Sequence, residues 1–528
     1  MDNANDKRLF WACVIALGVT AFGFSVRATL LDQWGEQFGL NEVEKGQING
    51  VGVWPFVVTI ILFSLVVDKI GYGRSMVFAF VAHVSYVLIV TCAPLALAPT
   101  GASPQAVAAG QRTGYWLLYI GNLVFALGNG TVEAVINPVV ATMFRHHKTK
   151  WLNILHAGWP GGLVLAGLMT IAMGDIDWRF KVALIVLPAI LYGVMMLGCR
   201  FPVQERVAAG ESYHTMLQEF GILSAAIVVA LIVREVGGNV YGMSWQMQTL
   251  ITLTVVGTFG LYVRALGRPL FVFLLLLMIP LATTELGTDG WITSLMEPQM
   301  KKIDLNAAWL LVYTSFIMMV LRFLAGPIVH KLSPLGLLAV SAIVAALGLL
   351  FLSHAAGIAL LAAATIYGFG KTFLWPTMLG VVAERFPKGG ALTLNATTGV
   401  GMLGVGVLGF PFVGLIQEDA VRRDMQAQQP GIYEQISVEK EGVFGSYIAV
   451  NPARMQKLSQ EQSRQVTQIE EGAKQGALAT VAIFPVIMFS CYIGLIIYFK
   501  RRGGYKAEVI GIRSSNPNRT TSQTRRSR

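Results

Sequence analysis

The stretch GNGTVEAVINPVV, residues 128–140, lies within a long apolar run and contains one charged residue, Glu133. A carboxylate in apolar surroundings is costly unless it is neutralised, paired or placed in a wet cavity. The whole chain of 528 residues is 54% hydrophobic and only 13% charged, whereas soluble proteins carry about a quarter charged residues. Several windows exceed the ~18 apolar residues needed to cross a bilayer. We therefore predict an all-α membrane protein with Glu133 inside a spanning helix.

Fourteen apolar segments are long enough to be predicted as membrane spans. They lie at residues 9–33, 46–67, 75–97, 114–141, 151–173, 180–201, 220–236, 247–266, 269–293, 307–329, 335–354, 356–382, 391–416 and 476–499. An even number of spans predicts that both chain termini lie on the same side of the membrane.

Basic residues gather in alternate short loops, among them RHHKTK (145–150), RALGR (264–268) and ERFPK (384–388). Lys and Arg are enriched on cytoplasmic loops, so this pattern predicts cytoplasmic N- and C-termini. The net charge of +11 is explained in the same way, and we expect no nucleic-acid partner. We expect an integral protein of a bacterial inner (plasma) membrane that works as a monomer in the lipid bilayer.

The chain repeats itself weakly. INPVVATMFRHHKTKWLNILHAG, from residue 136, parallels LWPTMLGVVAERFPKGGALTLNATTG, from residue 374, so that Pro138 corresponds to Pro376 and Asn153 to Asn395. Two related halves are typical of secondary transporters. The predicted units are a six-helix half at 9–201, an inserted transmembrane hairpin at 220–266, a second six-helix half at 268–500 and a disordered tail at 501–528.

A long outer loop is predicted at 417–475, within the second half. Asn451 is a good helix cap and Pro452 suits the first helical position, so an amphipathic helix is expected to begin there. The loop is expected to act as a spacer or as a lid over the outer mouth.

Two short loops resemble signatures of the major facilitator superfamily. VVDKIGYGR (66–74) and LRFLAGPIVHKLSP (321–334) match its two cytoplasmic motifs. The resemblance implies two six-helix halves around a central cavity. It also implies that a set of residues near the cytoplasmic ends of the helices controls gating: Asp68, Gly71, Arg74, Arg322 and Lys331.

The run EAVINP (133–138), followed by Leu152–Asn153, resembles the fucose and sugar–proton symporter group within that superfamily. The resemblance implies that Glu133 is the proton-handling carboxylate beside the sugar. The chain departs from the group in its first helix, where Arg27 and Ala28 stand in place of an Asn-Asp pair.

Few charges are predicted to lie within the membrane. The superfamily fold implies that the first and fourth helices of each half line the cavity, which places Arg27 opposite Glu133 and Glu285 opposite Lys371. An opposite charge nearby offsets the burial of an ion. We therefore expect two facing ion pairs that handle the coupled proton, or that only hold helices together. Asp289 is expected near the outer mouth.

Sugar recognition needs hydrogen-bonding groups and flat aromatic faces. The candidate substrate-binding residues on the expected cavity helices are Asn137, Asn153, His156, Trp159, Trp291, Trp375 and Asn395. Each of them also has an ordinary reason to be present, since Trp packs at interfaces and buried polar side chains join helices.

These features predict a transporter that takes up a sugar or related polar solute together with protons. An efflux antiporter is an alternative, because GWPGG (158–162) faintly resembles a motif of drug–proton antiporters. Arg27 and Lys371 raise a third option, an organic anion such as a sugar acid. The sequence contains no nucleotide-binding loop, metal-ligand set or nucleophile arrangement, so we expect neither an enzyme nor a cofactor or metal. A transporter-like nutrient sensor is disfavoured because no output domain is evident.

Overall fold

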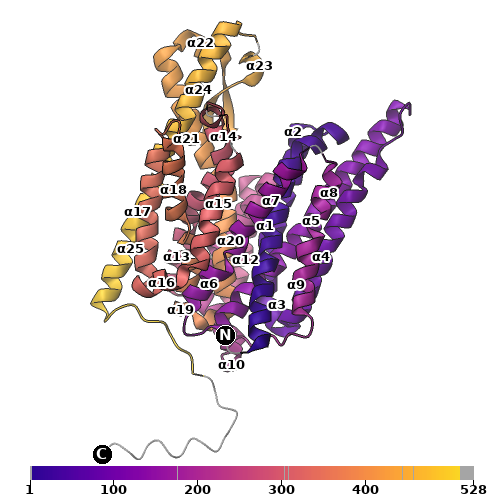
Figure 1. Cartoon of the computed structure of the whole chain (residues 1–528). Helices are drawn as coiled ribbons and strands as arrows, with labels where there is room; N and C mark the ends of the chain where they lie inside the picture. Colours follow the sequence, from indigo (N-terminus) through magenta and orange to yellow (C-terminus); the bar gives the residue numbers. More distant parts are fainter. Residues whose placement is uncertain are drawn as a thin grey trace, which may run out of the picture.

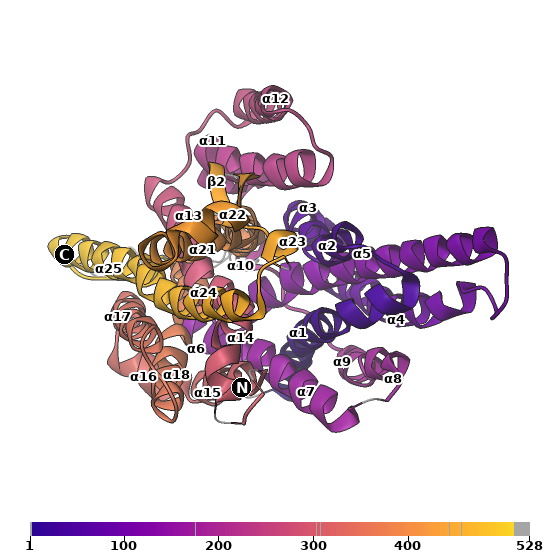
Figure 2. The same ribbon diagram turned by 90° about the horizontal axis from the view of Figure 1, so that it is seen from above.

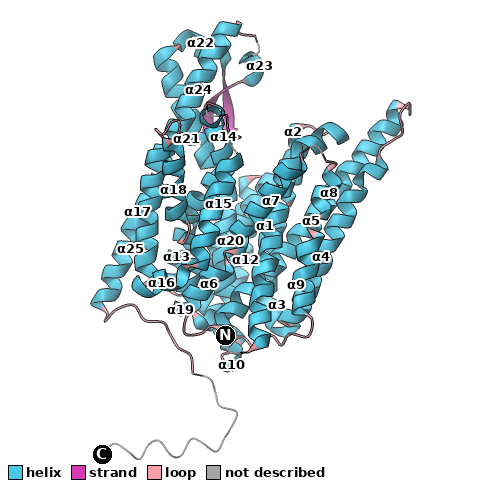
Figure 3. Ribbon diagram, viewed as in Figure 1, coloured by secondary structure: helices cyan, strands magenta, loops and turns pink. Residues whose placement is uncertain are grey.

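The computed structural model describes residues 3–174, 176–302, 304–306, 308–442, 444–455 and 457–511. Most of this chain is helical (Figure 3), as expected where lipid cannot satisfy backbone polar groups. Several helices begin where a polar side chain caps the first turn, for example at Asn3, Ser103 and Ser333. The predicted tail beyond residue 511 and the side chain of Trp291 lie outside the described residues.

The N half is a bundle around a 40-residue helix. Its elements are α1 (Ala4–Phe38), α2 (Glu42–Val51), α3 (Trp54–Ile70), α4 (Tyr72–Cys92), η1 (Ala93–Ala96), α5 (Pro104–Met143), α6 (Lys148–Leu155), α7 (Gly158–Met173), α8 (Trp178–Ala183) and α9 (Val186–Met196).

The C half has more breaks in its helices. Its elements are α13 (Pro269–Ala282), π-helical η3 (Thr283–Gly287), α14 (Thr288–Lys301), α15 (Ala308–Phe323), α16 (Ala325–Lys331), α17 (Pro334–Leu352), α18 (Ala359–Lys371), α19 (Leu374–Arg385), η4 (Pro387–Gly389), α20 (Gly390–Gly404), π-helical η5 (Val405–Gly409), α21 (Phe410–Gln428) and α25 (Ile483–Arg501).

Eleven of the described helices are long and apolar enough to cross a membrane, and the shorter helix Trp309–Phe323 is also apolar. They coincide with eleven of the fourteen predicted spans. The other three segments fall on α12, on α15 and on the interrupted pair α18–α19. The predicted count of fourteen is therefore not confirmed.

The bundle has two opposite faces (Figure 1). The start of α1, the short helix α10 (Glu205–Ala208) and the end of α25 lie on one of them, called here the terminal face. The segment between α21 and α25 lies on the other, called the loop-bearing face. The halves contact each other through α3 with α20, α6 with α19, and α7 with α15.

In the sequence between the two halves the chain forms a helical hairpin, in the region where an inserted transmembrane hairpin was predicted at 220–266. It consists of α11 (Tyr213–Ile232), π-helical η2 (Val233–Val240) and α12 (Trp245–Val263). α11 packs against α20, whereas α12 lies outside α11, away from the halves (Figure 2). Its insertion into the membrane as a second span stays a prediction.

The predicted outer loop is largely ordered. It contains α22 (Pro430–Ile436), the antiparallel strands β1 (Ser437–Gly442) and β2 (Gly445–Val450), α23 (Pro452–Met455) and α24 (Gln460–Val481). A helix begins at Pro452 as predicted, with the Arg454 N–H donating to Asn451 Oδ1 at 3.4 Å, but it ends at Met455 and is not the long amphipathic helix. That helix begins at Gln460, where Ser459 and Gln462 form a capping box.

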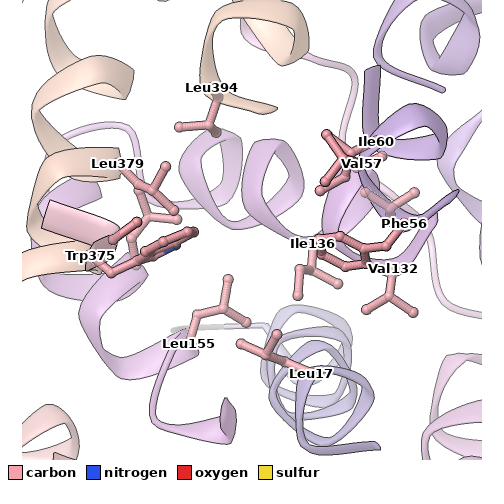
Figure 4. Close-up of a cluster of buried hydrophobic side chains, with 14 of the residues drawn as sticks. Leu17, Phe56, Val57, Ile60, Val132, Ile136, Leu155, Trp375, Leu379 and Leu394 are labelled. Atoms are coloured by element: carbon pink, nitrogen blue, oxygen red, sulfur yellow. The ribbon is translucent and has the colours of Figure 1, made fainter. Parts of the chain in front are cut away.

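Buried apolar side chains of both halves gather where the halves meet (Figure 4). Leu155 of α6 and Ile136 of α5 belong to the N half, whereas Leu379 of α19 and Leu394 of α20 belong to the C half. These side chains are all buried, so the interface is an apolar layer that excludes water from the polar groups beside it.

Candidate functional site

A small cavity lies between the two halves. Its lining brings together predicted and unpredicted residues: Phe56, Glu133, His156, Trp159, Glu285, Leu286, Arg322, Trp375, Thr398 and Met402. The cavity has a volume of about 20 Å³, which is enough for about one water molecule. Seven segments of the sequence, three from the N half and four from the C half, therefore meet at one polar point inside an otherwise apolar interface.

Glu133 lies on α5, and only 3% of its surface is exposed. One helical turn later, Asn137 donates a hydrogen bond from Nδ2 to Glu133 Oε2 at 2.6 Å. Among the described residues no cation bonds to this carboxylate, so the predicted ion pair between Arg27 and Glu133 is wrong for this structure. Arg27 instead lies over the ring of Phe24, 5.0 Å from its centroid.

Hydrogen bonds on either side of His156, one to its ring and one to its backbone, connect Glu133 to the C half. Asn137 Oδ1 lies 3.0 Å from His156 Nε2, and the backbone carbonyl of His156 accepts from Arg322 Nη1 at 2.9 Å. Arg322 Nη2 then donates to Glu285 Oε1 at 2.7 Å. The two acids of the cavity, one in each half, are thus joined through Asn137, His156 and Arg322.

The buried charges of the C half form two ion pairs with partners other than those predicted. Glu285 pairs with Arg322, and Lys371 pairs with Asp289. Lys371 also lies 3.4 Å from Thr314 Oγ1. The expected Glu285–Lys371 pair is therefore wrong, and Asp289 is not a solvated end residue, since its side chain is only 13% exposed. Two acids and two bases leave this cluster neutral.

Arg322 lies deeper than the sequence motif suggested. We expected it near the gating end of its helix, but α15 stops at Phe323, and the separate helix α16 carries the chain onward to Lys331. The break at Leu324 leaves Arg322 in the last turn of α15, fully enclosed beside the cavity. Arg322 thus lies beside the cavity and not at the terminal face, and its predicted gating role stays a prediction.

Pro376 explains why Arg322 finds a partner there. A proline within a helix lacks an N–H and displaces the carbonyl four residues earlier. Here the freed carbonyl belongs to Thr372, which accepts from Arg322 Nε at 2.7 Å. The backbone N–H of Trp375, in the first turn of α19, donates to Glu285 Oε2 at 3.2 Å.

The corresponding proline of the N half has a similar effect. Pro138 lies inside α5, and the carbonyl four residues earlier, that of Ala134, accepts from Asn395 Nδ2 at 2.9 Å. Asn395 also donates to Ser64, while Asn153 donates to Thr377 Oγ1 at 3.2 Å. The two Asn residues predicted to be equivalent therefore both bridge the halves. Neither lines the cavity, and substrate contact by them stays a prediction.

The remaining gating candidates lie at the terminal face. Asp68 forms a buried ion pair with Arg206, a residue the sequence reasoning missed. Gly71 joins α3 to α4 with a backbone φ of 90°, which favours glycine. Arg74 and Lys331 are exposed. These positions are compatible with a gate, but their roles stay predictions.

Four residues missed by sequence reasoning join the halves at the terminal face. Lys148 donates to Glu205 at 2.6 Å and to the carbonyl of Ala383 at 3.0 Å. Thr149 Oγ1 donates to Glu384 Oε1 at 2.6 Å. Three of these residues, Lys148, Thr149 and Glu384, lie in the two loops RHHKTK and ERFPK, which were noted in the sequence for their basic residues and which contact each other in the structure.

Residues 505–511, called here the C-terminal strap, lie over these contacts. Tyr505 Oη donates to Glu384 Oε2 at 2.9 Å, and the N–H of Glu508 donates to the carbonyl of Glu384 at 2.8 Å. Burial and the neighbouring Glu384 carboxylate raise the pKa of Tyr505 well above its usual value, so the phenol stays protonated and remains a donor. Glu384 therefore binds the N half and the strap at once.

Replacing Glu384 by Ala is expected to open the terminal face at least about tenfold more often, since 1.4 kcal/mol corresponds to a factor of ten. The change removes hydrogen bonds to a charged group, each worth about 1.5–3 kcal/mol. The measurement is alkylation of a single Cys at Ala141, which is buried beside Lys148 and Ala383, after replacement of the four natural cysteines. Glu297→Ala, at an exposed acid on α14, is the matched control. Equal alkylation rates in Glu384→Ala and its parent would contradict this role.

A larger hollow of about 500 Å³ lies near the loop-bearing face. Its lining includes Phe410 and Glu418 of α21, Phe444 and Tyr447 of the β-hairpin region, and Lys474 of α24. No predicted site residue is among those that line it. The central cavity is therefore the candidate site.

Comparisons with known proteins agree with this architecture. The family model described as Major Facilitator Superfamily matches residues 13–411. No curated protein matches the chain. Solved structures with the same fold include the E. coli proton:xylose symporter XylE, with 13% identity, a TM-score of 0.57 and coverage of 93% of this chain and 97% of that one.

Two further structures are similar. The E. coli fucose:proton symporter FucP has 14% identity and a TM-score of 0.54 over 90% of this chain and 98% of that one. The human organic anion transporter MFSD10 has 11% identity and a TM-score of 0.56 over 93% and 100%. At these identities the likeness concerns the fold, and the family match covers most of the sequence. The chain therefore belongs to the major facilitator superfamily.

Proposed function

We propose that this protein is a secondary transporter that moves a sugar or related polar solute together with a proton. The observation that carries the proposal is the contrast between the two acids of the cavity. Glu285 is bonded to a guanidinium, whereas Glu133 is bonded to a neutral amide. A buried carboxylate with no cation beside it is readily neutralised by a proton. Glu133 is thus the proposed proton carrier.

The cavity geometry supports alternating access. Room for about one water is far too little for a sugar ring, so the halves must separate for a solute to enter. The contacts of Lys148, Thr149 and Asn153 at or near the terminal face are hydrogen bonds that break and form again without covalent change. The π-helical turns and helix breaks of the C half lie beside the cavity and supply places where helices bend.

The hydrogen-bond chain supports coupling between proton and conformation. Protonation of Glu133 weakens the charge-assisted hydrogen bond that it accepts from Asn137. The same Asn137 amide also contacts the ring of His156 through its oxygen. His156 in turn accepts from Arg322 across the interface between the halves. The protonation state of an N-half acid is therefore linked to a bond that holds the halves together.

The lining of the cavity suits a sugar. Trp159 and Trp375 offer flat faces for C–H groups, while His156 and Thr398 offer hydrogen bonds to hydroxyls. XylE and FucP, two of the similar structures, are sugar–proton symporters. The basic loops lie on the terminal face, which we assign to the cytoplasm together with both termini. An inward proton gradient then drives uptake, because proton and solute move in the same direction in the proposed symport.

Proteoliposomes with an inward proton gradient test the proposal. We expect gradient-driven accumulation of at least one solute from a panel of neutral sugars and their uronic acids. One pH unit supports about tenfold accumulation in electroneutral one-to-one coupling, since 1.4 kcal/mol corresponds to a factor of ten. Expulsion of a lipophilic cation, without uptake of any panel member, would instead establish an efflux antiporter.

A further inference from the structure

Arg27 is a buried cation that its surroundings do not neutralise. Its side chain is 1% exposed, on α1, and its Nε and Nη2 atoms have no hydrogen-bond partner in the described part of the chain. The two buried bases of the C half differ from it, since Arg322 pairs with Glu285 and Lys371 with Asp289. Arg27 therefore keeps two donors free inside the protein.

The surroundings of Arg27 are built to hold it in place. Phe24, one turn earlier on α1, presents its ring to the guanidinium. Gly52, between α2 and α3, leaves the space that the guanidinium occupies, because a Cβ at residue 52 would lie 1.6 Å from Arg27 Nη1. The hydroxyl of Tyr86 is also buried without a partner among the described residues, and the Tyr86 ring packs on Phe125, which lies against Gly23 of α1. The unpartnered donors of Arg27 are thus held in a fixed position on α1.

This point adjoins the central cavity. The ring of Phe24 packs against Trp159, with centroids 6.1 Å apart, and Trp159 lines the cavity. Gly52 stands one helical turn before Phe56, another cavity residue. Because α1 runs from the terminal face toward the loop-bearing face, Arg27 lies one turn beyond Phe24 on the loop-bearing side.

We propose that Arg27 binds the carboxylate of the transported solute, which makes the substrate an organic acid such as a sugar acid. The fork of guanidinium donors matches the two oxygens of a carboxylate. This inference rests on the proposed function. The charges also balance: a proton neutralises Glu133 while the carboxylate neutralises Arg27, so one proton and one anion enter with no net charge.

Binding to the purified full-length protein tests the substrate class. The probes are two matched pairs, D-glucuronate with D-glucose and D-galacturonate with D-galactose, and the readout is ligand-induced thermal stabilisation confirmed by calorimetry. We expect a uronate to bind and its neutral partner to bind at least tenfold more weakly. Arg27→Gln is expected to weaken uronate binding roughly 10- to 100-fold, as for the loss of hydrogen bonds between charged groups. Arg112→Gln, at an exposed arginine, is the matched control and should change nothing.

Gly52→Ala offers a second variant that leaves Arg27 itself intact. Its methyl group is expected to displace the guanidinium and to weaken uronate binding as strongly as Arg27→Gln. Gly50→Ala, two residues earlier with open space around its Cβ position, is the control. Any loss of thermal stability in Gly52→Ala should disappear in the Arg27→Gln background, where the conflicting group is gone.

The outcomes separate this inference from the proposed function. Equal binding of uronates and neutral sugars, unchanged uronate binding in Arg27→Gln, or no uronate binding at all would overturn the inference. Proton-driven uptake of a neutral sugar that increases with a negative-inside potential would also overturn it, while the proposed function would stand. Uronate binding that depends on Arg27, without any proton-driven uptake, would support the inference and contradict the proposed function.

Discussion

Replacing Glu133 by Gln is expected to abolish uptake against a concentration gradient while downhill exchange of solute continues. Gln is nearly isosteric with Glu and keeps a partner for Asn137, so the packing of α5 is preserved. An amide does not gain or release a proton in the physiological range, so the coupled step is lost. Under a gradient of one pH unit, accumulation should fall from about tenfold to none.

The measurement is uptake and counterflow of a transported solute in proteoliposomes. Counterflow reports exchange alone, so its survival shows that Glu133→Gln still folds and binds. Glu297→Gln, at an exposed acid on the loop-bearing side, is the matched control and should accumulate solute normally. Normal accumulation by Glu133→Gln would remove this residue from the proton pathway.

Replacing Arg322 by Gln is expected to lower the free energy of unfolding by several kcal/mol, about 3–5. Glu285 would still accept a hydrogen bond from the Trp375 N–H, but it would lose the Arg322 cation while remaining buried. Breaking a buried ion pair in this way costs about 3–5 kcal/mol. The same change removes the bond to the His156 carbonyl across the halves. Transport should therefore fall together with stability.

A double-mutant cycle separates the ion pair from other effects of the change. The variants are Arg322→Gln, Glu285→Gln and their combination, compared by unfolding in detergent. If the pair is the cause, the combined variant should be more stable than Arg322→Gln alone. Arg112→Gln, whose ion pair with Glu44 is exposed, should cost less than about 1 kcal/mol. Strictly additive losses at residues 285 and 322 would contradict the coupling.

Much of the architecture follows from the apolar pattern. The positions of the spanning segments are read from hydropathy, and depth is set by the number of residues from each helix end. That the helices of Glu133 and Glu285 meet at a cavity was implied by the resemblance to the superfamily, and both residues line it. The same resemblance made His156, Trp159 and Trp375 candidates, and they also line it.

The ion-pair partners could not be predicted in this way. They depend on where each side chain points around its helix axis, and local irregularities change that direction. A π-helical turn surrounds Glu285, Lys371 is the last residue of α18, and α15 ends one residue after Arg322. None of these breaks changes the hydropathy. The β-hairpin at 437–450 was missed for a different reason, since its first strand, SVEKEG, is mostly polar.

The residues predicted to be equivalent in the two halves make similar contacts in the structure. Pro138 and Pro376 each lie one turn after a carbonyl that takes a side-chain donor, from Asn395 in one case and Arg322 in the other. Asn153 and Asn395 both reach across the interface. Equivalent positions thus make equivalent kinds of contact with different partners, as expected for two halves that move against each other.

Solute-induced proton movement shows directly whether a proton enters with the solute. A transported solute is added outside lightly buffered proteoliposomes that have no imposed gradient, and the external pH is recorded. We expect the medium to become more alkaline as protons enter with the solute, and Glu133→Gln to abolish this signal while solute exchange continues. Solute entry without a pH change, or an unchanged signal in Glu133→Gln, would contradict proton coupling through Glu133.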